Sequence, residues 1–76
     1  MADKKDVVNH PSHYNYGEIE VIDYINQVSS GYKKGYIAYC IGNVIKYVSR
    51  APFKNGLEDL KKAAWYLQSA IDKYDK

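Results

Sequence analysis

Apolar residues recur every three or four positions in three segments of the chain, the period of an amphipathic helix. We expect the first helix to begin at Glu18 and to end around Ser29–Gly31. Asn15 followed by Glu18 resembles a capping box at its start. Its apolar positions are Val21, Tyr24, Ile25 and Val28.

The second helix is predicted from about Tyr36 to Arg50, after a basic loop between Gly31 and Gly35. Pro52 should end it, because proline has no backbone N–H and clashes with the preceding helical turn. Its continuous apolar face consists of Ile37, Cys40, Ile41, Val44, Ile45 and Val48.

The third helix is predicted from about Leu57 to Tyr74, after a turn at Asn55-Gly56. Asn55 with Glu58 forms a second pattern that resembles a capping box. We expect a core-facing stripe of Leu57, Leu60, Ala64, Leu67, Ile71 and Tyr74.

Three helices with short connections predict an all-α fold, a small three-helix domain. Residues 1–9 are polar apart from two valines, and we expect a flexible N-terminal arm there. Residues 10–76 should form one helical domain that opens with an ordered loop over residues 10–17. A short hairpin within residues 7–17 is the alternative for that stretch.

The chain has 76 residues, and a chain this short buries only about 60% of the surface that it exposes when unfolded, so its stability is marginal on its own. Its single cysteine, Cys40, excludes an internal disulfide. Nine tyrosines are many for this length, and tyrosine favours interfaces and ligand walls. We therefore expect a homo-oligomer.

Charge is distributed unevenly. Residues 1–30 carry two basic and five acidic residues (−3), whereas residues 31–62 carry seven basic and two acidic residues (+5). A basic middle indicates an anionic partner such as a nucleotide. The net charge of +2 is too small for a general nucleic-acid binder. No segment resembles a signal peptide or a membrane span, so we expect a cytoplasmic protein without a membrane partner.

One stripe of the second helix carries the strongest candidate chemistry: Asn43, Lys46, Tyr47 and Arg50. Lys46 and Arg50 are one helical turn apart, so two cations share one face. Arginine binds phosphate through a planar fork and lysine through a point charge, and tyrosine stacks on a base. The alternative is a solvated face or a contact with another subunit.

Other candidates flank this stripe. His10, His13 and Tyr14 stand in the loop HPSHY, where the histidines suit phosphate binding or proton transfer better than a metal, for which no third ligand is evident. Lys54 and Trp65 are predicted as walls of the site. We expect no metal and no cofactor.

Glu20 and Asp23 form an ExxD pattern like that by which all-α nucleotide pyrophosphatases hold magnesium. Glu58 and Asp59 are a second acidic pair, but they do not have this spacing, so only one such pair is intact. Acids at these positions also suit helix starts, where the helix dipole favours negative charge.

The words HPSHY and GNVIKYVSRAPFKNGLEDLKKAAWYL, within residues 9–68, resemble a family of small phage and prophage domains of unknown function, often labelled nucleotide-kinase-like. The resemblance implies homo-oligomers and the host cytoplasm. It also places His10, His13, Tyr14, Asn43, Lys46, Tyr47 and Arg50 at family positions.

Together, the residues and the resemblance suggest a phage-type protein that binds a phosphorylated, nucleotide-like small molecule. Such a protein would sequester a host immune signal. A nucleoside monophosphate kinase, a nucleotide phosphohydrolase and a protein inhibitor of a host factor are the alternatives. The sequence leaves open whether the ligand is turned over, and it identifies no catalytic residue.

Overall fold

The computed structural model describes residues 15–16 and 19–75. The elements are strands β1 (Asn15–Tyr16) and β2 (Ile19–Glu20), helices α2 (Val21–Ser29), α3 (Gly35–Arg50) and α4 (Leu57–Lys73), and the 3₁₀ helix η2 (Ala51–Phe53). The predicted all-α fold is confirmed. The predicted arm (residues 1–9) and the HPSHY part of the predicted loop (residues 10–14) lie outside the described residues. Residues 15–16, which were predicted to belong to that loop, form β1 instead.

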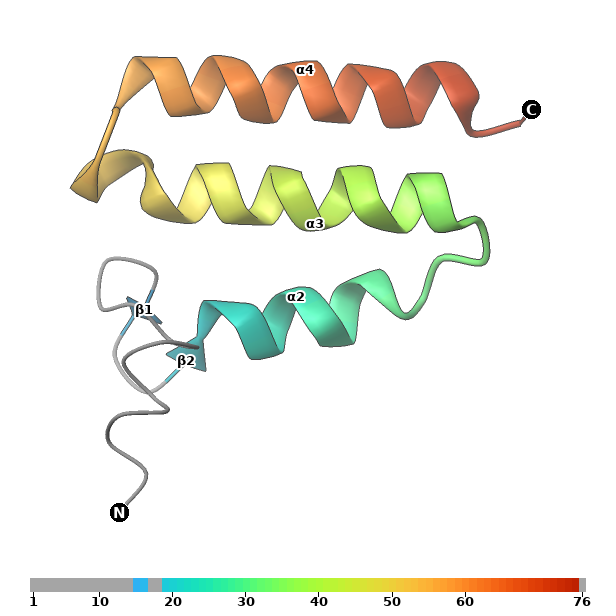
Figure 1. Ribbon diagram of the computed structural model, residues 1–76, viewed down its shortest axis with the longest axis horizontal. Coiled ribbons are helices and arrows are strands. Elements are labelled where there is room, and N and C mark those ends of the chain that lie inside the picture. Colours follow the sequence, from blue (N-terminus) through green and yellow to red (C-terminus); the bar gives the residue numbers. More distant parts are fainter. Residues whose placement is uncertain (1–14, 17–18, 76) are drawn as a thin grey trace.

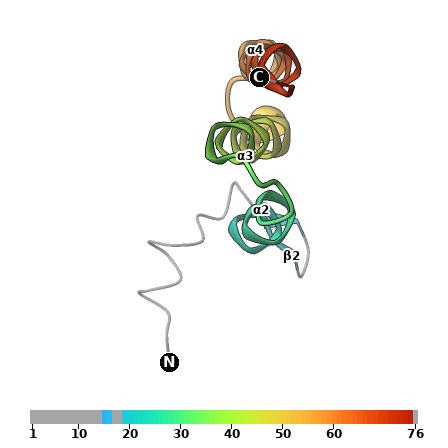
Figure 2. The ribbon, with the colours of Figure 1, turned by 90° about the vertical axis from the view of Figure 1, so that its right-hand side faces the viewer.

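Three helices lie side by side in one layer, with α3 between α2 and α4 (Figure 1). Viewed end-on, they form a single column rather than a bundle (Figure 2). The layer measures 45 × 28 × 17 Å. Its smallest dimension leaves room for little more than one helix, which has a diameter of about 10–12 Å with side chains. The layer therefore has two broad faces.

The first helix begins later than predicted. Asn15 lies in β1, which pairs antiparallel with β2 in the register Asn15↔Glu20. The residue at the start of α2 is Glu20, which makes no side-chain capping bond. The predicted cap at Asn15 is therefore wrong, because the chain forms a short strand pair before it enters the helix.

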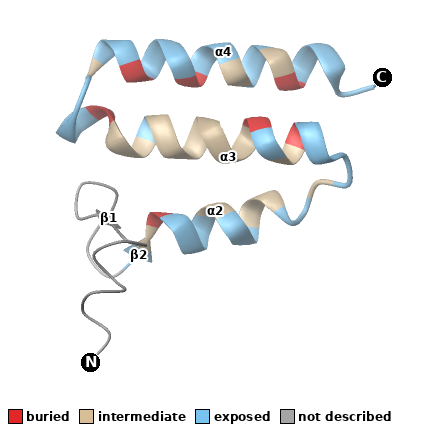
Figure 3. Ribbon diagram, viewed as in Figure 1, coloured by how far each residue is buried: buried red, intermediate tan, exposed pale blue. Residues whose placement is uncertain are grey.

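The helices meet through small residues. A Cβ on Gly42 would lie 3.2 Å from Ile25 Cγ2, so glycine permits the close approach of α2 and α3. Between α3 and α4 the buried residues include Ile37, Cys40 and Ala70. Buried positions follow the lines where helices face each other, and the outer surfaces are exposed (Figure 3). No helix among the described residues is long and apolar enough to span a membrane.

The stripe that α4 turns toward α3 is not the predicted one. It consists of Asp59, Ala63, Tyr66 and Ala70, of which all but the half-buried Tyr66 are buried. The core assignment was wrong for Leu57, Leu60, Ala64, Leu67, Ile71 and Tyr74, which are all exposed. The two stripes repeat with the same spacing of three and four residues, so periodicity does not distinguish them. Alanines allow the two helices a closer approach than leucines would.

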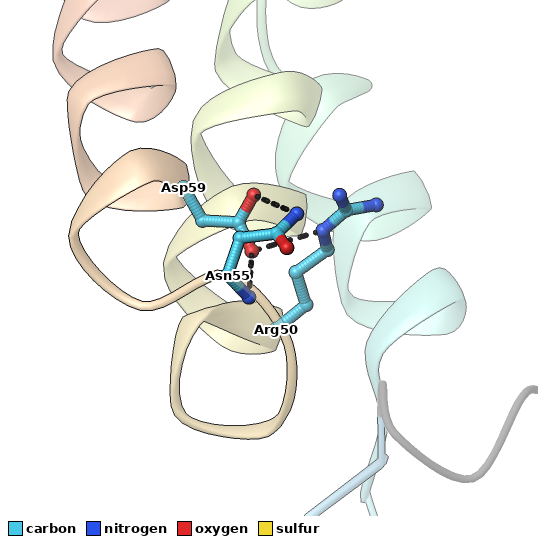
Figure 4. A network of polar contacts seen from close by, with 3 residues as sticks. All are labelled: Arg50, Asn55 and Asp59. Carbon is cyan, nitrogen blue, oxygen red and sulfur yellow. Dashed lines mark hydrogen bonds and ion pairs between the residues drawn. The ribbon is translucent and has the colours of Figure 1, made fainter.

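The junction between α3 and α4 is organised by one buried carboxylate (Figure 4). Asp59 is fully buried, and its Oδ2 accepts from Arg50 Nε at 3.1 Å and from the backbone N–H of Asn55 at 3.2 Å. Asn55 Nδ2 donates to Oδ1 at 3.5 Å. Asn55 therefore does not cap α4 with Glu58 as predicted. Gly56 takes the N-cap position with a positive φ of 51°.

These contacts outweigh the cost of burying the charge. Burial alone would raise the pKa of Asp59, but the hydrogen bonds from Arg50 and Asn55, with the charge of Arg50, lower it below 3.8. Asp59 is thus an anion at neutral pH that ties the end of α3 to the first turn of α4.

We predict that Asp59→Asn destabilises the protein strongly. The change leaves the half-buried Arg50 guanidinium without its anion, and removing one partner of a buried pair costs far more than losing a surface pair. The melting temperature should fall on the order of 10 °C, measured by circular dichroism. Glu58→Gln changes the exposed acid beside Asp59 in the same turn of α4, so it is the matched control and should change the midpoint little. Equal shifts in both variants would contradict the role of Asp59.

Acid should unfold the wild type through the same group. The folded-state pKa of Asp59 lies below its unfolded value of 3.8, so its contribution is complete above about pH 4. The contribution declines as pH falls from there toward the folded-state pKa. Urea midpoints measured between pH 7 and pH 2.5 should show this decline in the wild type. The difference between wild type and Asp59→Asn should narrow over the same range; a constant difference would exclude Asp59 as its source.

Candidate functional site

Three cations surround one tyrosine ring at the α3–α4 contact. Lys46 Nζ lies 4.7 Å from the ring centroid of Tyr47, Arg50 Cζ lies 5.2 Å from it, and Lys62 Nζ lies 5.5 Å from it. Cations at such distances are attracted by the electrons of the ring face. Because all three carry a positive charge, they also repel one another.

The ring of Tyr47 continues into an aromatic series. It stacks on Tyr66 with centroids 5.9 Å apart and an interplanar angle of 15°. Tyr39 and Trp65 each meet Tyr66 edge-on, with centroids 5.7 Å and 5.1 Å away. Trp65 is 63% exposed and Tyr39 is 55% exposed, so both keep ring surface open to a ligand.

Hydrogen bonds fix the phenols of this series. The hydroxyls of Tyr39 and Tyr66 are 3.4 Å apart, and those of Tyr36 and Ser69 are 2.7 Å apart. The hydrogen bond with Tyr39, together with burial, raises the pKa of Tyr66 to about 12. At neutral pH Tyr66 is therefore a neutral hydrogen-bonding group and not a base.

A groove of about 470 Å³ runs along the same side of α3, between α2 and α3. Ile22 and Ile25 of α2 form apolar walls, and Tyr39, Asn43 and Lys46 line the α3 side. Asn43 Nδ2 donates to the backbone O of Tyr39 at 2.9 Å, and its Oδ1 accepts no hydrogen bond from another described residue. Lys46 belongs both to the groove and to the cations around Tyr47.

These contacts define one broad side of the layer, which we call the tyrosine face. It consists of Tyr36, Tyr39, Asn43, Lys46, Tyr47, Arg50, Lys62, Trp65, Tyr66 and Ser69. Its polar groups come from α3 and α4, and its apolar groove lies between α2 and α3.

The structure brings most of the described candidates together. Lys46, Tyr47 and Arg50 lie around one ring, with Asn43 beside them in the groove. Trp65 joins them through its contact with Tyr66.

One described candidate, Lys54, stands apart from this cluster. Lys54 is exposed at the end of η2, and no side-chain contact joins it to the face within the described part of the chain. His10, His13 and Tyr14 lie outside the described residues.

The sequence prediction missed Lys62 and Tyr66. They lie four residues apart on α4, so they share one side of that helix. The prediction followed a different stripe of α4 and left them unassigned. The Asp59–Arg50 pair was missed too, although it fixes which side of α4 faces α3.

The two members of each acidic pair have different surroundings. Asp59 is fully buried against Arg50, whereas Glu58 is exposed on the same turn. Glu20 precedes α2 and Asp23 is exposed in its first turn. Within residues 15–16 and 19–75, no three His, Cys, Asp or Glu side chains gather closely enough to hold a metal ion.

Comparison with known proteins yields a family but no solved relative. Gene 1.7 protein of Enterobacteria phage T3 is 40% identical over 75 residues, covering 92% of this chain and 44% of that protein. The chain thus spans less than half the length of this phage relative. No solved structure matches this chain significantly. A family profile matches residues 8–68, which include α2, α3 and the turns of α4 that carry Lys62 and Trp65. The chain belongs to the family of proteins of unknown function designated DUF3310.

Proposed function

We propose that the tyrosine face binds a phosphorylated, nucleotide-like small molecule. The observation that carries the proposal is the gathering of Lys46, Arg50 and Lys62 within 5.5 Å of the centroid of the Tyr47 ring. An anion placed among them would relieve their mutual repulsion and receive charge-assisted hydrogen bonds.

The charges around Tyr47 are only partly compensated. Arg50 binds the buried carboxylate of Asp59 through Nε. Lys46 and Lys62 form no ion pair with an acid among the described residues. A phosphate would therefore bind chiefly between these two lysines, with Arg50 as an oriented neighbour.

The aromatic rings and the groove suit the rest of such a ligand. Trp65 and Tyr39 offer exposed ring surface for a base, and base–aromatic stacking contributes about 1–3 kcal/mol per base. The apolar groove between α2 and α3 ends at Lys46, so a ligand there would also reach the cations.

Binding without turnover is the simpler form of this function. Phosphoryl transfer requires a group that activates the attacking oxygen, besides cations that neutralise charge. The tyrosine face supplies cations and, in Tyr66, a phenol that is neutral at pH 7 because its pKa is raised to about 12. Nucleoside monophosphate kinase activity, nucleotide phosphohydrolase activity and inhibition of a host protein stay predictions from the sequence. Sequestration of a host signal stays a prediction as well. If the protein is incubated with a nucleotide and then denatured, recovery of the unchanged nucleotide would support binding without catalytic turnover.

We predict that Lys62→Ala and Lys46→Ala each weaken nucleotide binding about tenfold, since a charge-assisted hydrogen bond contributes about 1.5 kcal/mol. Isothermal calorimetry with nucleoside mono-, di- and triphosphates and cyclic dinucleotides measures the change. Lys61→Ala is the matched control, because it removes the same charge from the next position of α4 but away from Tyr47. The proposal fails if no phosphorylated nucleotide binds, or if the three variants behave alike.

The only tryptophan reports on the base. Because Trp65 is 63% exposed beside Tyr66, a bound nucleotide should quench its fluorescence, whereas inorganic phosphate should leave it unchanged. Titration of the wild type with each compound tests this. A nucleotide that binds in calorimetry without changing the emission would place its base away from Trp65.

A further inference from the structure

The side of the layer opposite the tyrosine face is apolar. Leu57 and Ile71 of α4 are 67% and 59% exposed, and Tyr74, directly after α4, is 57% exposed. These residues belong to a stripe whose spacing alternates between three and four. The stripe consists of Leu57, Leu60, Ala64, Leu67, Ile71 and Tyr74. This is the a/d pattern of a helix that packs against another helix, yet no element within the described chain covers it.

The apolar surface extends from α4 onto α3. A hollow of about 410 Å³ is lined by Ile37 and Ile41 of α3 and by Leu67, Ile71 and Tyr74 at the far end of the chain. Val48 follows Ile41 by about two helical turns, so it lies on the same side of α3, and it is 49% exposed. We call this surface, with the α4 stripe, the apolar face.

The two faces are opposed by helix geometry. Residues two positions apart on an α-helix point about 200° apart. Ile41 of the apolar face and Asn43 of the tyrosine face are such a pair on α3, as are Leu67 and Trp65 on α4. An occupant of the apolar face would therefore not obstruct the tyrosine face.

A second copy of the chain fits this surface in size and shape. A layer of 45 × 28 Å offers more area than the about 800 Å² per partner that specific interfaces bury. A stripe with a/d spacing is self-complementary across a two-fold axis, because its knobs fill the holes of an identical stripe. Two stacked layers would also enclose the core that one layer, 17 Å thick, cannot build.

Charges beside the stripe select the direction of pairing. Lys61 flanks its first half, and Asp72 and Asp75 flank its second half. Parallel helices would keep Lys61 of one copy at the opposite end of the stripe from Asp72 and Asp75 of the second copy. Antiparallel helices bring Lys61 of one copy to the end of the stripe where the second copy carries Asp72 and Asp75.

We propose that the protein forms a two-fold dimer through the apolar face, with α4 antiparallel to α4 of the second copy. The tyrosine faces then lie on the two outer sides of the dimer. The inference does not depend on the proposed ligand, since it rests on exposure, spacing and charge alone.

The mass of the particle tests the interface. Light scattering on the wild type should give at least twice the chain mass of 8.7 kDa, and Ile71→Lys should reduce it to the monomer. Ile22→Lys is the matched control: Ile22 is also half-exposed, at 48%, but lines the groove on the tyrosine face. Leu67→Gln is a milder second variant in case Ile71→Lys loses its helical circular dichroism. A monomeric wild type, or a mass that neither apolar-face variant lowers, overturns the proposal.

Charge reversal tests the direction. Lys61→Glu should weaken the antiparallel dimer severalfold at low salt, because it faces two aspartates of the second copy. Adding Asp72→Lys and Asp75→Lys should restore dimerisation. In a parallel dimer Lys61 would lie far from Asp72 and Asp75 of the second copy, so an unchanged dissociation constant in sedimentation overturns the antiparallel arrangement.

Discussion

The arrangement of the helices in a single layer determines most of what this protein can do. In a bundle each helix turns its apolar side inward. Among the three described helices, α3 has a helix on each of two sides, whereas α2 and α4 each pack against α3 alone (Figure 2). Burial is therefore confined to narrow lines between helices, and residues such as Cys40 and Ala70 occupy them. The remaining apolar area stays on the surface. A 76-residue chain with this geometry gains much of its possible burial only by association, which is the general situation of small domains without disulfides.

The turn between α3 and α4 sets which side of α4 meets α3. Asp59 holds Arg50 and Asn55 at the same point, so α4 is fixed in rotation from its first turn. Tyr66 lies seven residues after Asp59, two helical turns further along the same side. It therefore arrives beside Tyr47, and the two rings stack. Arg50 joins both features, because its Nε binds Asp59 while its guanidinium lies over the Tyr47 ring. A structural ion pair thus positions one of the three cations of the candidate site.

The sequence predicted the positions of the helices better than the directions in which their sides point. Pro52 marked the end of α3, and the Asn55-Gly56 turn marked the start of α4. The predicted bounds of both helices agree with the structure within a residue. The side of α4 could not be predicted, since two stripes share one spacing and the more apolar stripe is the exposed one. The spacing of apolar residues within one helix contains no sign that the carboxylate of Asp59 pairs with Arg50 across the turn. Lys62 and Tyr66 were missed for the same reason, whereas Lys46, Tyr47 and Arg50 were found because they lie on one side of one helix.

The two faces also make sense together in electrostatic terms. Identical copies present identical charges, so pairing through the tyrosine face would bring two groups of three cations against each other. Pairing through the apolar face separates these groups by two layers, each 17 Å thick. That separation exceeds the screening length of about 8 Å at physiological salt, so the repulsion between them is small. The placement of lysine and tyrosine on one side and of leucine and isoleucine on the other therefore favours one way for two copies to meet, and it keeps the tyrosine face outside that contact.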